Sequence, residues 1–164
     1  MGSLETKQEV LDGMSEDLKL RNYSVSTQRD YLFIVRRFQN YFDKPASQMG
    51  AEEVREYLLH LVEEKCLKPS TLNTYNCAIR FLFSVTFDMP LNSAKVPFSK
   101  SIPSIPNILT RDEVQAMFDA CDNLRDKSIL MVTYSAGLRL SETAKLRVKD
   151  IDSLKMRLFI EKIP

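Results

Sequence analysis

A proline-dense stretch without helical periodicity divides this chain into two parts. Four prolines and several serines lie between residues 90 and 109; the prolines are Pro90, Pro97, Pro103 and Pro106. Proline fixes φ and lacks an amide hydrogen, so this density disfavours a helix and favours an extended, semi-rigid connection. At 164 residues the chain has room for two small domains. We therefore predict a first domain at residues 1–90, a linker at 91–108 and a second region at 109–164.

Before the linker, apolar residues recur at the three- and four-residue spacing of amphipathic helices. Four such stripes follow one another. The residues expected to face inward are Val10, Leu11, Met14 and Leu18, then Tyr31, Ile34, Val35, Phe38, Tyr41 and Phe42, then Val54, Tyr57, Leu58, Leu61 and Val62, and finally Leu72, Tyr75, Ile79, Leu82 and Phe83. We expect Ser26 or Thr27 to begin the second helix and Pro69 to begin the fourth. The pattern predicts a mainly α, four-helix bundle.

Two of these helices carry a polar row opposite the apolar stripe. The candidate DNA-binding residues are Arg29, Arg36 and Arg37 on the second helix and Lys68, Thr71, Asn73, Asn76 and Arg80 on the fourth. Basic side chains bind phosphates, and amide side chains can contact base edges, so such rows suit helices that lie along a DNA groove. An ordinary solvent-exposed face shows the same pattern, and the rows alone leave both interpretations open.

Charge, cysteines and hydropathy narrow the kinds of protein that the sequence can encode. The net charge is +1, so DNA binding requires a local basic face. Cys66, Cys77 and Cys121 lack the spacing of metal ligands, and we interpret them as reduced thiols of a cytoplasmic protein. His60, the single histidine, lies beside apolar residues and suits a structural role. No apolar run is long enough to span a membrane. We expect no metal, no cofactor and no membrane partner.

The region after the linker begins and ends with local structural signals. Leu109-Thr110-x-x-Glu113 is a capping-box pattern, which predicts a helix start at Thr110. We expect a turn after Lys149-Asp150-Ile151-Asp152. The alternation within residues 156–160 predicts a β-strand.

Between these signals, Arg139 lies among residues that favour a corner between two helices. Gly137 lets the backbone turn after an apolar helix. Ser141 suits the N-cap of the next helix, and Glu142 places a carboxylate near its positive end. Arg139 is then held on a stiff corner, where its planar guanidinium can bind two phosphate oxygens. The alternative is that Arg139 merely forms an ion pair with Glu142 or another carboxylate.

This segment resembles the first catalytic-arginine box of the tyrosine recombinases, the phage integrase family that includes Xer-like enzymes. The matching residues are Tyr134, Gly137, Leu138, Arg139, Leu140, Ser141, Glu142 and Leu146, followed by Lys149-Asp150-Ile151-Asp152. The resemblance implies that the helical bundle is a SAM-like core-binding domain for double-stranded DNA. It also implies that an incomplete α+β catalytic domain follows, and that the protein self-associates on DNA in the prokaryotic cytosol or nucleoid.

The resemblance further implies site-specific strand exchange through a 3′-phosphotyrosyl intermediate, without metal or ATP. Arg139 would bind the non-bridging oxygens of the phosphate, Glu142 would support it, and Lys162 is a candidate for the family's catalytic lysine. The family's His-x-x-Arg motif and tyrosine nucleophile are not among these 164 residues. We therefore expect the DNA-binding portion of a recombinase or integrase that is inactive alone.

Two other functions remain open at this point. The chain can be a non-catalytic DNA-binding regulator that occupies recombination sites. It can also be a helical protein-interaction module, in which case the basic rows would have no role in DNA binding.

Overall fold

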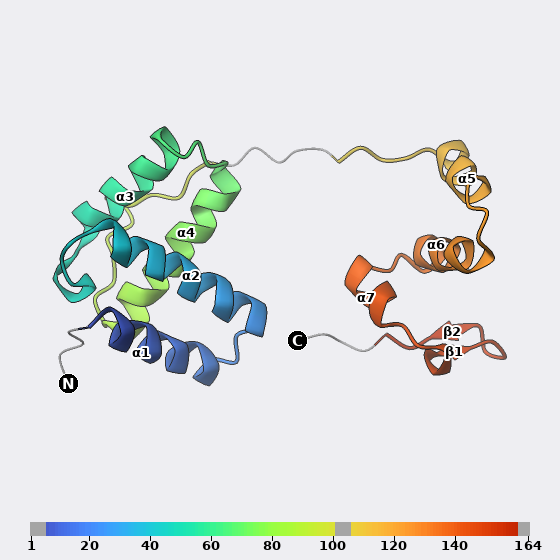
Figure 1. The fold of residues 1–164 in the computed structure, drawn as a ribbon, viewed down its shortest axis with the longest axis horizontal. Coiled ribbons are helices and arrows are strands. Elements are labelled where there is room, and N and C mark those ends of the chain that lie inside the picture. The colour runs from blue at the N-terminus through green and yellow to red at the C-terminus, as the bar shows by residue number, and fades with distance from the viewer. Residues whose placement is uncertain (1–5, 101–105, 161–164) are drawn as a thin grey trace. The chain divides into compact units, whose positions relative to one another are not determined.

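The computed structural model describes residues 6–100 and 106–160 of the protein. Its internal contacts divide the chain into two compact units, Met1–Pro103 and Ser104–Pro164 (Figure 1). Helices dominate both units, and the strands in the described residues form one two-stranded antiparallel sheet. The mainly α fold predicted from the sequence is therefore confirmed.

Within residues 6–100, the first unit contains four α-helices and two shorter helical turns. Their bounds are α1 (Lys7–Leu20), α2 (Val25–Tyr41), the 3₁₀ turn η1 (Ala46–Gln48), α3 (Ala51–Glu63), α4 (Pro69–Phe81) and the π-helical turn η2 (Leu82–Thr86). Helix α2 packs against α1 and α4, and α3 packs against α4 (Figure 1). This arrangement lets one face of each helix contribute to a common core.

The starts of α2 and α4 show how local chemistry sets helix boundaries. Helix α4 begins at Pro69, as predicted, because proline needs no amide hydrogen bond in the first turn. Helix α2 begins earlier than predicted. Ser24 is its N-cap, with the Ser24 hydroxyl accepting a hydrogen bond from the Thr27 amide at 3.2 Å. The sequence offered three hydroxyl residues in a row of four, and the first of them caps the helix.

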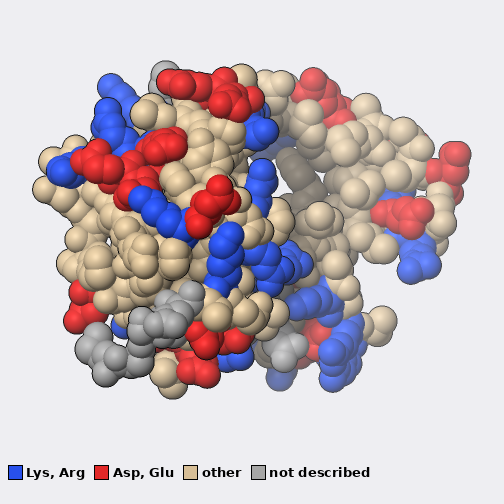
Figure 2. Space-filling view, turned by 60° about the vertical axis from the view of Figure 1, so that its left-hand side comes forward, with Lys and Arg blue, Asp and Glu red and all other residues tan. Residues whose placement is uncertain are grey.

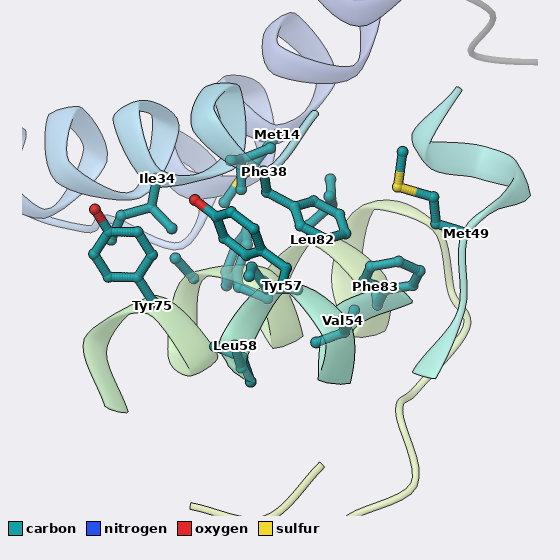
Figure 3. Close-up of a cluster of buried hydrophobic side chains, with 14 of the residues drawn as sticks. Met14, Ile34, Phe38, Met49, Val54, Tyr57, Leu58, Tyr75, Leu82 and Phe83 are labelled. Carbon is teal, nitrogen blue, oxygen red and sulfur yellow. The ribbon is translucent and has the colours of Figure 1, made fainter. Parts of the chain in front are cut away.

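The core of the first unit is filled by the predicted apolar stripes (Figure 3). Phe38 is completely buried, and its ring meets those of Tyr57 and Phe83 at centroid distances of 5.4 and 6.3 Å. Two members of the stripes differ from the prediction: Tyr41 is 38% exposed and Val62 is 43% exposed. Both lie at the carboxyl ends of their helices, where neighbouring helices cover them less.

The segment after η2 does not behave as a free linker. Val96 is 1% exposed and belongs to the core of the first unit, and Leu91 packs against that core. Hydrogen bonds from α4 hold this segment as far as Ser99. Residues 91–99 therefore belong structurally to the bundle, and the predicted linker at 91–108 begins too early.

The described part of the second unit, residues 106–160, contains three α-helices, a 3₁₀ turn and a short hairpin. The bounds are α5 (Arg111–Asp119), α6 (Leu124–Ala136), α7 (Leu140–Lys145), η3 (Val148–Asp150), β1 (Ile151–Asp152) and β2 (Arg157–Leu158). Ile151 pairs with Leu158 and Asp152 with Arg157. The predicted strand is confirmed at two of its residues. The predicted turn between residue 152 and this strand is confirmed, since residues 153–156 form a turn, and Ile151 and Asp152 form the partner strand.

The predicted capping box at the start of α5 is confirmed. The Thr110 amide donates to the Glu113 carboxylate at 2.7 Å, and the Glu113 amide donates to the Thr110 hydroxyl at 3.3 Å. Two of the helix's otherwise unsatisfied amides are thereby bonded.

Candidate functional site

Arg139 lies at a tight corner between α6 and α7. Helix α6 ends at Gly137, whose φ of 64° and ψ of 35° lie in the left-handed region. The Leu138 amide closes the helix end by donating to the Thr133 carbonyl at 3.0 Å. A Cβ added at Gly137 would meet no atom within 4 Å, so the backbone conformation, and not lack of space, favours glycine here. The predicted turn at Gly137 is confirmed.

The start of α7 differs from the prediction. Arg139, and not Ser141, is the N-cap residue, and Ser141 lies inside the first turn. Glu142 reaches back and accepts a hydrogen bond from the Arg139 amide at 2.7 Å. The Thr143 hydroxyl then lies 3.1 Å from the Thr133 hydroxyl, which joins α7 to α6. Glutamate at the third helical position thus bonds the amide of the N-cap residue, as in the second half of a capping box.

The same carboxylate also holds the Arg139 side chain. Guanidinium nitrogen Nη1 of Arg139 donates to Oε1 of Glu142 at 3.0 Å. The hydrogen bonds from the Arg139 amide and then from its guanidinium lower the pKa of Glu142, so this carboxylate is ionised at neutral pH. The Arg139 side chain is 83% exposed, whereas that of Glu142 is 19% exposed. Glu142 uses one of the five guanidinium donors, so Arg139 keeps donors for a second anion.

The ion pair between Arg139 and Glu142, which the sequence offered as the alternative role of Arg139, is thus formed in the structure. It does not compete with phosphate binding, because the pair leaves most of the guanidinium facing solvent. The other predicted catalytic candidate, Lys162, lies outside the described residues.

The basic row on α2 is exposed, and one member is joined to α4. Arg29 lies 3.4 Å from the neighbouring Asp30, with both side chains more than half exposed. Arg36 is exposed. Arg37 donates to the Tyr75 hydroxyl at 3.2 Å, and its guanidinium lies 5.7 Å from the ring centroid of Phe33. The bond to Tyr75 fixes the row relative to the start of α4.

A hollow of about 340 Å³ lies between α2 and the first turns of α4. It is lined by Asp30, Phe33, Ile34, Ser70, Thr71, Thr74 and Tyr75. Lys68 is the N-cap residue of α4. It is exposed, and it lies two residues before Ser70 in the sequence. The structure therefore brings the predicted residue Thr71 into one hollow with Asp30 and Phe33 of α2, while the three arginines of the α2 row do not line it. Basic and acidic side chains are interspersed on the face drawn in Figure 2.

Sequence reasoning missed the aromatic and hydroxyl members of this hollow. Phe33 is 55% exposed although it lies between Arg29 and Arg37 in sequence, and a large apolar residue inside a basic row was the available signal. Ser70 and Thr74 follow Lys68 on the first turns of α4, where hydroxyl groups next to a cation are compatible with phosphate contact.

The predicted row on α4 has a different environment. Asn76 is 1% exposed, so the expectation of an exposed polar face is wrong at this position. Asn73 bonds to Ser99, Asn76 to Pro97, and Arg80 to Leu91 and Val96. These three side chains face the segment 91–99 and do not join the α2 row.

Comparisons with known proteins agree with this architecture. The model of the phage integrase N-terminal SAM-like domain matches residues 10–93, which is more than half of the chain. The model of the phage integrase family matches residues 107–163. The chain belongs to the phage integrase family. This finding confirms the resemblance that was based on the arginine box.

Relatives of this phage integrase family member are recombinases by name. The integrase/recombinase-type protein y4qK of Sinorhizobium fredii is 40% identical over 149 residues, covering 90% of this chain and 48% of y4qK. Tyrosine recombinase XerA of Pyrococcus horikoshii is 28% identical, over 93% of this chain and 51% of XerA. The chain thus spans about half the length of these curated relatives.

A solved structure supports the fold. The crystal structure of a XerA recombinase superposes with a TM-score of 0.51 at 20% identity, covering 96% of this chain and 56% of that one. Within the described residues, no helix combines the length and the apolar character needed to cross a bilayer.

Proposed function

We propose that the chain is the DNA-binding portion of a site-specific tyrosine recombinase or integrase. The observation that carries this proposal is the Arg139 corner, where a capped helix start and one carboxylate hold an exposed guanidinium in place. A rigid bidentate donor of this kind suits a phosphate whose charge grows in a pentacoordinate transition state. Arg139 would bind its non-bridging oxygens, and Glu142 would orient the guanidinium. Lys162 stays a candidate for the catalytic lysine.

In this proposal double-stranded DNA lies against the first unit. The interface would consist of Arg29, Arg36, Arg37, Lys68 and Thr71. Arg37 is already aligned by Tyr75 and Phe33, so it gives up less conformational entropy when it binds a phosphate. The row of Asn73, Asn76 and Arg80, predicted to contact DNA, makes intramolecular hydrogen bonds instead, and we leave it outside the proposed interface. We also propose that the protein self-associates on DNA, and the support for this part is its membership of the phage integrase family.

We also propose that these 164 residues do not cleave DNA by themselves. A tyrosine nucleophile must reach a phosphate and lose its proton. Burial raises the pKa of Tyr57 to about 12 and raises that of Tyr31, which is the wrong direction for a nucleophile. Tyr134 packs edge-on against Phe118 at 5.9 Å. A nucleophile supplied by further sequence would attack the phosphate that Arg139 holds.

The test is a chimaera in which residues 1–164 are joined to the remaining half of y4qK. A DNA substrate nicked near the scissile phosphate traps covalent protein–DNA adducts, which a denaturing gel resolves. We expect the chimaera to form an adduct, and Arg139→Ala to slow its formation by about 10²–10³-fold, because one transition-state donor is removed. Arg125→Ala, a change at an exposed arginine on α6, is the matched control and should leave the rate unchanged.

The outcomes separate the alternatives. An adduct formed by the 164-residue chain alone would overturn its proposed inactivity. An active Arg139→Ala chimaera would overturn the role of the arginine corner. A chimaera that binds the substrate and forms no adduct would instead favour a regulator that occupies recombination sites.

A further inference from the structure

Residues 91–99 form a strap that runs back along α4 (Figure 1). At its far end, Asn73 exchanges two hydrogen bonds with Ser99. The Asn73 side chain donates to the Ser99 carbonyl at 2.9 Å and accepts from the Ser99 amide at 2.8 Å. One turn later on α4, Asn76 donates to the Pro97 carbonyl at 3.0 Å. These side-chain amides thereby bond backbone groups of the strap that a neighbouring β-strand would otherwise bond.

Arg80 completes this row and binds the near end of the strap. Its Nε donates to Oδ1 of Asn76 at 3.0 Å, and its terminal nitrogens donate to the carbonyls of Leu91 and Val96. Its guanidinium also lies 5.2 Å from the ring centroid of Phe98. A planar group with several donors in fixed directions can bond two carbonyls of an irregular segment at once, and the flexible point charge of a lysine fixes their positions less well.

Helix α3 holds the same strap from its other side. Lys95 forms an ion pair with Glu52 at 2.9 Å, and Arg55 donates to the Lys95 carbonyl at 3.3 Å. Between these contacts the Val96 side chain is 1% exposed. A buried anchor with hydrogen bonds on both sides resists local opening.

We propose that Asn73, Asn76 and Arg80 are positioning residues, which we name the strap clamp, and that they set the number of residues that connect the bundle of the first unit to the second unit. With the clamp closed, ten residues, 100–109, connect the strap to α5. Ten residues span at most about 35 Å, whereas the nineteen residues 91–109 would span about 65 Å. The clamp therefore roughly halves the reach of the second unit.

The functional consequence rests on the function proposed above. If the first unit binds DNA, closing the clamp shortens the reach of the second unit by about 30 Å, which corresponds to about nine base pairs because DNA rises about 3.4 Å per pair. A shorter tether also raises the effective concentration of the second unit at the bound duplex. The strap clamp would then help to select which phosphate is engaged.

Limited trypsin digestion of the whole chain tests the clamp. The two informative bonds are Lys95–Val96, inside the strap, and Lys100–Ser101, beyond it. We expect cleavage after Lys100 to precede cleavage after Lys95 in the unmodified protein. Asn73→Ala removes both bonds to Ser99 and favours helix, so it should raise the rate at Lys95–Val96 about tenfold. Arg80→Lys keeps the charge and should raise that rate further.

The controls address folding. Ser84→Ala removes a hydroxyl that, among the residues the structure describes, bonds to the Arg80 carbonyl one turn earlier, and it should leave the cleavage rate unchanged. Circular dichroism reports whether a variant keeps its helices; if Arg80→Lys loses them, Asn73→Ala decides. Equal cleavage after Lys95 in the unmodified protein and in Asn73→Ala would overturn the clamp.

A distance measurement tests its effect on reach. Cys66 and Cys121 lie in different units, and after Cys77→Ser they can carry a pair of fluorescent dyes. Asn73→Ala should lengthen the mean dye distance and broaden its distribution. If the clamp only stabilised the strap locally, this replacement would leave the distribution unchanged. Identical distributions would overturn the positioning role. Both measurements are made without DNA, so a failure of DNA binding would contradict the proposed function and leave the clamp standing.

Discussion

Both units are built largely from helices, but they bury their apolar side chains to very different extents. In the first unit, four helices enclose side chains such as Met14, Leu18 and Phe38, each with no exposed surface. Within residues 106–160, Val114 is the one buried side chain. Leu140, Leu154 and Met156 of the second unit are each more than 85% exposed. A hollow of about 700 Å³ also lies between α6 and the hairpin.

This difference shows that a segment can form well-capped helices without burying their apolar side chains in a core. The second unit has well-formed helix ends, with the Thr110–Glu113 box, the left-handed Gly137 and the Arg139–Glu142 cap. Local hydrogen bonds of this kind define an element but contribute little to the stability of a domain. The first unit adds the burial that local signals cannot supply. We therefore expect its packing to dominate the free energy of unfolding.

The largest effect should come from the aromatic centre of the first unit. Phe38→Ala removes a completely buried ring that contacts Tyr57 and Phe83, and it should lower the free energy of unfolding by about 3–5 kcal/mol. Phe159→Ala, at a ring of the second unit that is 61% exposed, is the matched control and should cost about 0.5 kcal/mol or less. Urea denaturation followed by circular dichroism measures both. Equal losses would show that the units do not differ in packing.

A smaller effect is expected at the one glutamine inside this core. Gln39 is 1% exposed, and neither of its amide atoms has a hydrogen-bond partner among the described residues. Gln39→Met keeps the volume and removes the unsatisfied group, so it should raise the free energy of unfolding by about 1–2 kcal/mol. Gln28 donates to the Tyr23 carbonyl at 2.7 Å, and Gln28→Met should instead destabilise. A destabilised Gln39→Met protein would indicate a bonded amide.

The smallest effect concerns the capping carboxylates, which occur in both units. Hydrogen bonds from Lys44 and then from the Gly50 amide lower the pKa of Glu53 from 4.5 to about 2. Because the folded-state pKa is lower than the unfolded one, this stabilisation is complete above about pH 4.5 and is lost as the pH falls towards 2. Glu53→Gln should cost about 1 kcal/mol at pH 7 and progressively less below pH 4.5.

The matched change in the second unit is Glu113→Gln. Its carboxylate also has a lowered pKa, through hydrogen bonds from Thr110, but α5 packs against no comparable core. This change should leave the free energy of unfolding of the first unit unaltered between pH 2 and pH 7, as measured by circular dichroism. A pH dependence of the Glu53→Gln effect with the opposite sign would contradict the assigned cause.

The sequence predicts features whose cause is local, and it fails where the cause is tertiary. Gly137 and the Thr110–Glu113 pair act over four residues or fewer, and both were predictable. The α4 row was interpreted as a DNA face because its partners on residues 91–99 are distant in sequence. Arg80 looks the same in a helical pattern whether it faces phosphates or carbonyl groups. The linker boundary was wrong for the same reason, since proline content does not reveal that Val96 is buried.

The central claim is that the first unit binds DNA through α2 and the start of α4, whereas Arg139 serves the reaction. The most direct measurement is the affinity of the whole chain for a labelled duplex, by fluorescence anisotropy over a series of salt concentrations. Combined replacement of Arg29, Arg36 and Lys68 by alanine should flatten the slope of log affinity against log salt by about 0.9 for each phosphate that the protein no longer neutralises. Arg139→Ala should flatten the slope by no more than the amount expected for a single phosphate. Combined replacement of Arg125, Lys127 and Lys155, three cations outside the proposed interface, should leave the slope unchanged. A flattened slope in this last variant, with unchanged binding by the first, would contradict the account.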